Sequence, residues 1–286
     1  MLRVRPIESF DLPELQPYRT MRRQMEHRQQ GLFVAEGEKV VRRLLESGFT
    51  VVSVLLPEKW LLDLRPLLEA RTETIDVFVA PKKLLETLTG FSMYQGLLAL
   101  GKVPRLPGLL ELLDGATGAI ASEHYLEAPE TRHPLLLVAA EGLSSAENMG
   151  LLVRNCAAFS AHGLIVGETC SSPFLRRAVR SSMGTIFQLP IVESPSLVES
   201  LRVLRKHGVR CIAAHPRDHL KPVWRTDFTK PCCIVFGSEG YGISTGVLNL
   251  CDEAVAIPMR PTVDSLNVGS AAAAFLYEAV RQRSRA

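Results

Sequence analysis

Three segments in the C-terminal half of the chain combine amide, carboxylate, guanidinium and glycine groups in patterns that could bind a ligand. In the first, Asn148 is followed six residues later by Arg154, which lies among apolar neighbours in an expected helix. An Arg in so apolar a helix needs either a partner or a functional role. The sequence offers Glu141 or Glu239 as a partner in an internal salt bridge, and both explanations stay open on the residues alone.

The second segment, residues 236–242, reads Phe-Gly-Ser-Glu-Gly-Tyr-Gly between an expected strand and an expected helix. Glycines there let backbone approach a ligand closely and leave N–H groups free at a helix start. Their spacing is not that of the dinucleotide fingerprint, and no Gly-Lys-Ser/Thr of a phosphate loop follows. Ser238 lacks the flanking glycines of a nucleophile elbow. A turn that requires positive φ explains these glycines equally well.

The third segment runs from Ile257 to Asn267 and precedes the last expected helix. We expect Ser265 to cap that helix, which would place Asn267 in its first turn with the amide toward a ligand or solvent. Pro258 cannot donate a hydrogen bond to a neighbouring strand, so the carbonyl groups of the strand end are available. Gly269 and the small residues after it predict a close approach to another element, either inside the fold or across a dimer.

Alternating apolar runs and helical patterns predict the elements that position these segments. In the first half, strands are expected at 32–35, 51–56, 75–80 and 96–103, and helices at 36–47, 59–70, 81–89 and 109–113. In the second half, strands are expected at 135–141, 163–166, 187–192, 209–214, 232–237 and 254–259, and helices at 146–161, 173–183, 196–207, 243–251 and 265–283. Strands separated by helices favour an α/β fold whose parallel sheet is covered on both faces and binds ligands beyond the carboxyl ends of its strands.

The length of 286 residues with 47% apolar content suits about two globular domains. Because the pattern loosens between them, we expect an N-terminal domain at 1–101, a linker at 102–134 and a C-terminal domain at 135–286. No apolar run approaches the roughly 20 residues of a membrane span. Glu8 and Asp11 interrupt any export signal, and the six cysteines include no C-x-x-C pair, so we expect a cytoplasmic protein with reduced thiols and without a membrane or metal partner.

The net charge of +3 permits a polyanionic partner without requiring one. Two clusters of arginines could contact phosphates or could equally cover solvated helix faces. The first cluster contains Arg19, Arg22, Arg23 and Arg28, and the second contains Arg176, Arg177 and Arg180. The histidines show no metal-ligand spacing, so His162, His215 and His219 are expected to be surface or loop residues.

The three segments read E-N-M-G-x-x-x-R, V-F-G-S-E-G-x-G and I-P-M-x6-L-N-V, in that order. Together they resemble the signature of the SpoU/TrmH family of RNA ribose 2′-O-methyltransferases, which belongs to the SPOUT class. The resemblance extends from Leu135 to Glu278 and includes R-S-S-M-G-T-I-F-x-L-P at Arg180 to Pro190. The N-terminal half is similar to the family's small ribosomal-protein-like α/β domain, which binds RNA.

The resemblance implies a C-terminal domain with a deep trefoil knot, a homodimer, and S-adenosyl-L-methionine bound in the knot largely by backbone groups. The implied substrate is a ribose 2′-OH of a transfer or ribosomal RNA, held by Arg19, Arg22, Arg23 and Arg28. The implied catalytic residues are Arg154, Asn148, Glu239, Ser265 and Asn267. The implied cofactor contacts are Gly237, Gly240, Ile257, Met259 and Leu266.

In this family the counterpart of Arg154 is proposed as a general base. A guanidinium is a poor proton acceptor, so stabilising the developing alkoxide is physically easier. The chain departs from the family pattern at Ala146-Glu147, Ser160 and Gly269, which leaves the five implied catalytic positions in place. RNA positioning near Glu147 and packing near Gly269 are the properties that these departures affect.

Three other interpretations remain. A catalytically silent RNA-binding relative would not bind S-adenosylmethionine. A base methyltransferase of the same class would leave a modified base rather than a modified ribose. A nicotinamide enzyme on a doubly wound sheet is disfavoured by the glycine spacing of residues 237–242.

Overall fold

A computed structural model of the chain describes residues 2–21, 27, 29–89, 96–116, 134–216, 221–260 and 262–284. These residues form two compact units. The first unit comprises Met1–Arg105 and Phe174–Phe187, and the second comprises Leu106–Pro173 and Gln188–Ala286. The segment Phe174–Phe187 thus packs with the first unit, although it lies within the range 135–286 expected for the C-terminal domain. None of the described helices is long and apolar enough to cross a membrane.

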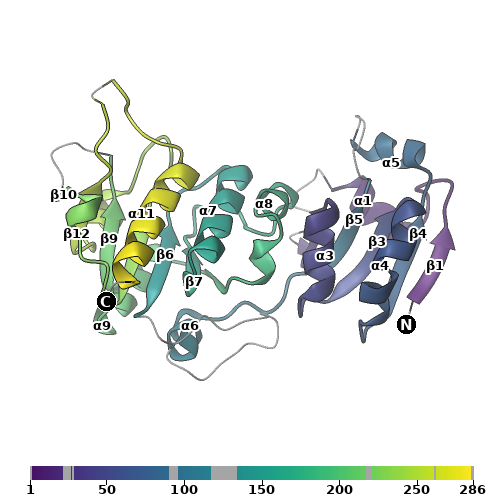
Figure 1. The fold of residues 1–286 in the computed structure, drawn as a ribbon, viewed down its shortest axis with the longest axis horizontal. Helices are drawn as coiled ribbons and strands as arrows, with labels where there is room; N and C mark the ends of the chain where they lie inside the picture. Colours follow the sequence, from purple (N-terminus) through teal and green to yellow (C-terminus); the bar gives the residue numbers. More distant parts are fainter. Residues whose placement is uncertain are drawn as a thin grey trace. The chain divides into compact units, whose positions relative to one another are not determined.

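The first unit is built on a mixed five-stranded sheet (Figure 1). Its strands lie in the order β1 (Leu2–Pro6), β4 (Ile75–Val79), β3 (Val51–Leu56), β5 (Leu98–Lys102) and β2 (Leu32–Glu36). Strand β5 runs antiparallel to β2 and β3, whereas β1, β4 and β3 are parallel. The helices of this unit are α1 (Gln16–Arg19), α3 (Glu38–Glu46), α4 (Lys59–Glu69), α5 (Lys82–Thr89) and α8 (Arg176–Ser181).

Most elements of the first unit follow the predicted pattern. Helix α3 buries Val40, Val41, Leu44 and Leu45, as its spacing of apolar residues requires. Strand β1 was not predicted, because Arg3 and Arg5 break the apolar pattern of an element that pairs only with β4. Such half-exposed edge strands carry a weak sequence signal.

An aromatic cluster joins the segment Phe174–Phe187 to the sheet of the first unit. The ring centroid of Phe187 lies 5.6 Å from that of Phe33 and 5.2 Å from that of Phe49. Gly101 makes room for this cluster, because a Cβ atom there would lie 2.4 Å from the ring of Phe33. The strand predicted at 187–192 is therefore wrong at its start: Phe187 ends a 3-10 turn, and β8 spans only Ile191–Glu193.

The second arginine cluster is partly occupied inside the first unit. Arg176 and Arg180 of α8 both form ion pairs with Glu36 at the end of β2, and the Arg180 contact measures 3.1 Å. The side chain of Glu36 is only 10% exposed, so these guanidinium groups balance a nearly buried carboxylate. Two of the three arginines considered as phosphate contacts thus have a structural role, and Arg177 stays exposed.

The second unit is built on a seven-stranded sheet in which every pair of neighbours is parallel. The strands lie in the order β10 (Lys221–Pro222), β12 (Glu253–Ala256), β9 (Arg210–Ala214), β11 (Cys232–Phe236), β6 (Leu136–Ala140), β7 (Gly163–Val166) and β8. The helices are α6 (Leu109–Ala116), α7 (Ala146–Ala158), α9 (Leu197–Lys206), α10 (Thr245–Leu248) and α11 (Val268–Arg283). The predicted parallel α/β fold is confirmed, while the knot stays a prediction.

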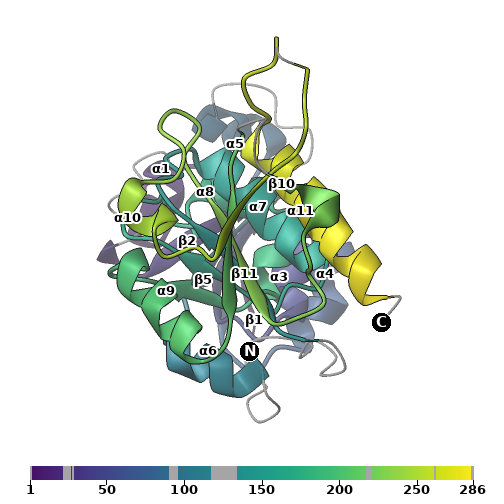
Figure 2. The same ribbon diagram turned by 90° about the vertical axis from the view of Figure 1, so that its left-hand side faces the viewer.

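Helices cover both faces of this sheet (Figure 2). On one face, residues of α6, α9 and α10 pack against alternate strand residues such as Leu137 and Ala139 of β6. Helices α7 and α11 contact each other on the opposite face. The alternation of strands and helices in the sequence predicted this double cover, and it agrees with β11, whose five residues, including Cys232 and Cys233, are all buried.

The end of α7 contains Ser160, one of the positions at which the chain departs from the pattern of the family that it resembles. The helix was expected to reach residue 161 but ends at Ala158, and Ser160 adopts a left-handed conformation with φ of 52°. Helices often end in this conformation, which glycine adopts without strain. The glycine that is usual in the family therefore suits this position better than Ser160 does, at a cost of roughly 1 kcal/mol.

A buried arginine fixes the end of α11 to the start of the sheet. Arg283 is only 6% exposed and donates from Nε to the Phe228 carbonyl at 2.8 Å. Its Nη2 donates to the carbonyl oxygens of Leu135 and Lys230, both at 3.1 Å. Its Nη1 donates to the carbonyl oxygen of Pro134. One guanidinium thus satisfies the carbonyl groups of two segments that are far apart in the sequence.

We expect Arg283→Met to destabilise the protein by about 3 kcal/mol, because the substitution keeps an unbranched stem and leaves several carbonyl groups without donors. Urea unfolding followed by circular dichroism measures the change. Arg202→Met is the matched control: Arg202 is 54% exposed and pairs with Glu199 one turn away, so its loss should cost less than about 0.5 kcal/mol. Equal effects of the two substitutions would contradict the role of Arg283.

Candidate functional site

The three segments whose residues could bind a ligand all follow the carboxyl ends of parallel strands in the second unit. Residues 141–145 connect β6 to α7, residues 237–244 connect β11 to α10, and residues 257–267 connect β12 to α11. Strands β6 and β11 are neighbours in the sheet, and only β9 lies between β11 and β12. The parallel direction of these strands therefore brings the three segments to one edge of the sheet.

Asn148, Glu239 and Asn267, one from each segment, form a hydrogen-bonded triangle at this edge. The Asn148 amide donates to Glu239 Oε1. Asn267 Nδ2 donates to Asn148 Oδ1 at 3.0 Å and to Glu239 Oε1 at 3.3 Å. Asn148 is only 9% exposed, whereas Glu239 and Asn267 are exposed, so the triangle is partly shielded from water on its Asn148 side. The structure thus joins three of the five residues expected to be catalytic.

The last helix begins later than expected, and the prediction that Ser265 caps it is wrong. Helix α11 starts at Val268, and the cap is Asn267, whose Oδ1 accepts from the Gly269 N–H at 2.8 Å. Both amide ends of Asn267 are therefore engaged, one in the helix cap and one in the triangle. Ser265 lies in the preceding loop, where it is exposed. Hydrogen bonding to Asn148 and Glu239 holds Asn267, rather than Ser265, at the start of the helix.

Helices α7 and α11 approach each other closely at Gly269, as the small residues of the sequence predict. Asn155 Nδ2 donates to the Gly269 carbonyl at 2.6 Å. A Cβ atom on Gly269 would lie 3.0 Å from Leu151 Cβ and 3.1 Å from Asn267 Oδ1. The close approach is inside the fold, and it holds the triangle residues of the two helices at a fixed separation.

The glycines of residues 236–242 have different roles. A Cβ atom on Gly237 would lie 2.2 Å from the Gly242 carbonyl carbon, so Gly237 is required by the tight return of the loop. Gly242 itself adopts a φ of 68°, which favours glycine. Gly240 has open space around its Cβ position. The requirement for positive φ therefore accounts for Gly242, close backbone packing accounts for Gly237, and Gly240 is the position where a ligand could approach backbone.

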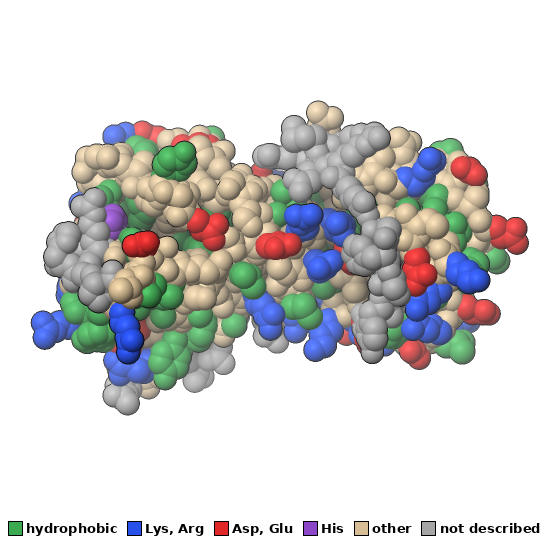
Figure 3. Space-filling view, turned by 90° about the horizontal axis from the view of Figure 1, so that it is seen from above, with side chains coloured by type: hydrophobic (Ala, Val, Ile, Leu, Met, Phe, Trp, Pro, Cys, Tyr) green, Lys and Arg blue, Asp and Glu red, His purple; other side chains and the backbone are tan. Residues whose placement is uncertain are grey.

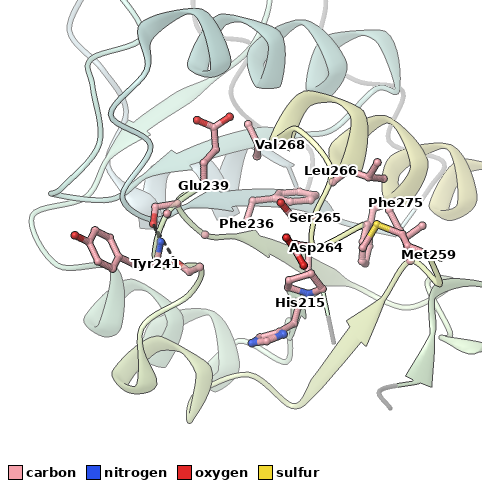
Figure 4. Close-up of a pocket in the computed structure, with 18 residues that line it drawn as sticks. His215, Phe236, Glu239, Tyr241, Met259, Asp264, Ser265, Leu266, Val268 and Phe275 are labelled. Carbon is pink, nitrogen blue, oxygen red and sulfur yellow. Dashed lines mark hydrogen bonds between the residues drawn. The ribbon is translucent and has the colours of Figure 1, made fainter. Parts of the chain in front are cut away.

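One hollow, here called the α11 hollow, lies between the loops after β11 and β12 and the start of α11. Its cavity volume is about 400 Å³. All five residues expected to contact a cofactor line it, namely Gly237, Gly240, Ile257, Met259 and Leu266. Figure 4 shows Met259, Leu266 and Phe275 on one side of the hollow and Glu239 on another.

The sequence interpretation did not identify Val268, Ala271 and Phe275, which also line the α11 hollow. These residues lie on one face of α11, because they are three and four positions apart. That spacing is present in the sequence, but it is equally typical of a helix face buried in a core. Asp264 adds a carboxylate to the same lining, next to Ser265.

A second hollow, here called the α7 hollow, shares the loop 238–242 with the first and lies toward α7. Its cavity volume is about 540 Å³. Glu141, Ser144, Ser145, Asn148 and Thr169 line it together with that loop. Glu239 and Gly240 border both hollows, whereas Asn148 borders only the α7 hollow and Asn267 borders neither, so the Glu239 corner of the triangle lies where the two cavities meet.

Arg154 lies apart from the triangle residues, and its side chain is exposed on α7. The internal salt bridge considered for it is wrong within the described part of the chain. Glu239 instead accepts from Asn148 and Asn267, and Glu141 accepts from the Ser244 N–H at 2.8 Å. The guanidinium donors of Arg154 are thus directed to solvent, where a substrate could reach them.

The N-terminal arginine cluster can be placed only in part. Arg19 is exposed at the end of α1, and its Nη1 donates to the Phe10 carbonyl at 3.4 Å. Arg22, Arg23 and Arg28 lie outside the described residues. Figure 3 shows basic side chains at several places on one face of the molecule, interspersed with acidic ones, as the net charge of +3 leads one to expect.

Cysteine and histidine groups of the second unit have structural environments. Burial raises the pKa of the Cys211 and Cys251 thiols to about 12, so both stay protonated at neutral pH and are poor nucleophiles. His162, expected at the surface, is buried, and its Nδ1 accepts from the Leu136 N–H at 3.1 Å. The ring of His162 thus supplies the hydrogen-bond acceptor for the backbone N–H of Leu136, the first residue of β6.

Comparisons with known proteins agree with this architecture. The SpoU rRNA Methylase family matches residues 135–277. An uncharacterized tRNA/rRNA methyltransferase of Mycobacterium leprae is 31% identical over 252 residues, which cover 88% of this chain and 71% of that protein. The 23S rRNA (uridine(2479)-2′-O)-methyltransferase of Streptomyces viridochromogenes is 36% identical over 162 residues, which cover 55% of this chain and 56% of that protein.

The crystal structure of the SpoU methyltransferase AviRb from Streptomyces viridochromogenes, in complex with the cofactor AdoMet, has the same fold. It superposes with a TM-score of 0.75 at 27% identity and covers 96% of this chain and 98% of that chain. The chain belongs to the SpoU rRNA methylase family, and the resemblance recognised in its three motifs is confirmed.

We expect Gly269→Ser, which introduces the residue usual in the family, to destabilise this protein by about 1 to 2 kcal/mol, because the added atoms crowd Leu151 and Asn267. Leu151→Gly, which removes the Cβ atom nearest to the added one, should relieve part of that cost, so the double variant should be more stable than the sum of the single effects predicts. Urea unfolding of the four proteins measures this coupling. A cost of Gly269→Ser that is the same in both backgrounds would contradict the proposed contact.

Proposed function

We propose that this chain is an RNA methyltransferase that transfers a methyl group from S-adenosyl-L-methionine to a ribose 2′-OH. The observation that carries the proposal is the triangle of Asn148, Glu239 and Asn267, whose Glu239 lines both hollows. A transferase of this kind must hold a cofactor and an acceptor side by side with their reacting atoms about 3 to 3.5 Å apart. The Streptomyces relative, which is named as a 23S rRNA 2′-O-methyltransferase, supports the same reaction.

The α11 hollow has the chemistry that S-adenosylmethionine requires. This cofactor carries a sulfonium and an ammonium group against one carboxylate, and the charged acids that line the hollow are Glu239 and Asp264. Apolar side chains such as Ile257 and Leu266 suit the adenine ring. A volume of about 400 Å³ lies in the ordinary range for sites of this kind. The AdoMet complex of AviRb supports this assignment.

The open position at Gly240 lets a ligand approach the backbone there. Pro258 cannot donate a hydrogen bond, and it lies between Ile257 and Met259 in the segment that follows β12. Backbone carbonyl groups of this segment would hold the cofactor's amino groups. When bound, S-adenosylmethionine supplies an electrophilic methyl group.

The residues around the hollows would then orient the acceptor. Asn148 is held by Glu239 and Asn267, so its amide is fixed in one orientation before a substrate binds. Such preorganised groups cost no rearrangement during the reaction. Ser265, on the loop before α11, lines the α11 hollow together with Glu239 and would contribute a hydroxyl there.

Arg154 would stabilise the alkoxide that develops at the ribose, because its donors are free and a guanidinium accepts a proton poorly. Among the described residues, Arg154 lines neither hollow. It would therefore reach the ribose hydroxyl when RNA or a second copy of the chain is bound. We propose that the chain forms a homodimer, which would supply that second copy. Leu151 and Tyr277 of the packed helices α7 and α11 are 36% and 59% exposed, which leaves apolar surface for such a contact.

The proposed substrate is a transfer or ribosomal RNA, and the Streptomyces relative favours the ribosomal one. The N-terminal arginines Arg19, Arg22, Arg23 and Arg28 would contact its phosphates. An RNA substrate and cysteines without disulfides fit a protein of the cytoplasm. A catalytically silent relative is the alternative, and it is disfavoured because all five expected catalytic positions are retained.

We expect Arg154→Ala to lower methyl transfer to RNA by about 100-fold or more, the usual effect of removing one donor to a developing oxyanion. The measurement is incorporation of labelled methyl groups into unmethylated total RNA from a strain that lacks the gene. Because Arg154 is exposed and unpaired within the described residues, unfolding temperature and cofactor affinity should stay close to wild type.

Arg202→Ala, another exposed arginine, serves as the control and should leave transfer unchanged. Transfer by Arg154→Ala within about threefold of wild type would rule out the assigned role, since a donor to the transition state is worth far more.

We expect RNA affinity to fall about 50-fold between 50 and 200 mM salt if four arginines contact phosphates of single-stranded RNA. Replacing Arg19, Arg22, Arg23 and Arg28 by Gln should reduce the slope of log affinity against log salt by about 2.8. Filter binding at four salt concentrations measures both. An affinity that does not change with salt, or a slope that the four substitutions leave unchanged, would contradict the proposed RNA contacts.

A further inference from the structure

We propose that the α7 hollow receives the target nucleoside, turned out of the RNA strand, and that the ring of Tyr241 stacks on its base. This inference rests on the proposed function and names the part of the site that takes the acceptor. It also assigns a role to a side chain that belongs to none of the expected catalytic or cofactor positions.

The position of the α7 hollow follows from the geometry of group transfer. The two hollows share the loop 238–242 as a common wall. With the cofactor in the α11 hollow, a ribose hydroxyl in the α7 hollow would meet the methyl group beside Glu239 and Asn148. A nucleoside bound elsewhere on the sheet edge would be separated from the methyl group by the loop itself.

The chemistry of the lining suits an uncharged nucleoside better than a phosphate. The charged side chains among its described residues are the carboxylates Glu141 and Glu239, and neither Lys nor Arg is among them. Carboxylates repel phosphate but accept hydrogen bonds from ribose hydroxyls and from base N–H groups. Ser144 and Thr169 add exposed hydroxyls that can donate or accept. The phosphates of the flanking nucleotides would thus stay outside the hollow, at its rim.

Tyr241 is presented to solvent by a firmly held loop. Its side chain is 99% exposed, yet its N–H donates to Ser238 Oγ at 3.0 Å. Ser238 and Gly242 exchange two backbone hydrogen bonds of 2.9 Å around it. Tyr241 borders both hollows, and in Figure 4 its ring points away from Phe236, Leu266 and Met259 of the α11 hollow.

A single exposed aromatic ring is ordinary on a protein surface. What distinguishes Tyr241 is its place on the wall between the two hollows and the fixed backbone that carries it. Unstacked RNA bases are commonly bound by stacking on aromatic rings, and one such contact is worth a change of about 5- to 150-fold in affinity. A rigid platform pays little conformational entropy for that contact.

The test measures kcat/KM for RNA and the dissociation constant of S-adenosylmethionine for Tyr241→Ala and Tyr241→Phe, with unmethylated total RNA from a strain that lacks the gene. We expect Tyr241→Ala to lower kcat/KM by about 5- to 150-fold and Tyr241→Phe to stay within about twofold of wild type, because stacking needs the ring and not the hydroxyl. Cofactor affinity, measured by calorimetry, should be unchanged in both.

Two further variants make the test specific. Thr169→Trp fills the α7 hollow from an exposed position outside the α11 hollow, so it should lower kcat/KM by about tenfold or more while cofactor affinity is kept. Trp224→Ala removes another exposed aromatic ring, 56% exposed and away from both linings, and should have no effect.

The inference is overturned if Tyr241→Ala keeps wild-type kcat/KM, if Tyr241→Phe loses as much as Tyr241→Ala, or if cofactor affinity falls in step with kcat/KM. The last outcome would assign Tyr241 to cofactor binding instead. If the wild type transfers methyl groups and the Tyr241 variants are unaffected, only this inference is contradicted and the proposed function stands. A wild type that transfers no methyl group contradicts the proposed function and this inference with it.

Discussion

The site depends on one hydrogen-bonded triangle, formed by Asn148, Glu239 and Asn267. Asn148 lies in the first turn of α7, Glu239 in the loop after β11 and Asn267 at the cap of α11, and these segments follow different parallel strands, so the triangle can form only when the sheet is correctly assembled. Asn267 also caps α11 through its Oδ1. The same side chain therefore sets the start of the last helix and the position of the Glu239 carboxylate. Gly269 serves this constraint, because its missing side chain lets α11 lie against Leu151 of α7.

The electrostatic character of the site follows from the same arrangement. Glu239 stands between the two hollows, Asp264 lines one and Glu141 lines the other, whereas the guanidinium of Arg154, which is exposed and has no ion-pair partner among the described residues, lies outside both. A cationic cofactor and an uncharged nucleoside are favoured inside, and phosphates are favoured outside. On the face shown in Figure 3 acidic and basic side chains are mixed, which fits an enzyme that binds RNA through local contacts rather than through a strongly basic surface.

Much of this fold and site could be predicted from the sequence, because apolar periodicity and strand-end motifs are local signals. Strand β3 at Val51–Leu56 and β7 at Gly163–Val166 match the predicted bounds. That Asn267 rather than Ser265 caps α11 could not be predicted, since it depends on hydrogen bonds of Asn267 to residues about 30 and 120 positions away along the chain. The role of Gly237 was likewise hidden, because its reason is contact with Gly242 rather than with a ligand. The packing of Phe187 into the first unit depends on Phe33 and Phe49, which no pattern near residue 187 reveals.

The central claim is that the chemistry at the triangle is methyl transfer to ribose oxygen. The most direct measurement is mass spectrometry of nucleosides from unmethylated RNA that has been treated with the protein and isotopically labelled S-adenosylmethionine. The account predicts a 2′-O-methylated nucleoside whose label is on the ribose, together with a phosphodiester bond that resists alkaline hydrolysis at that position. Label on a base, or no label in RNA from a protein that binds the cofactor, would contradict it.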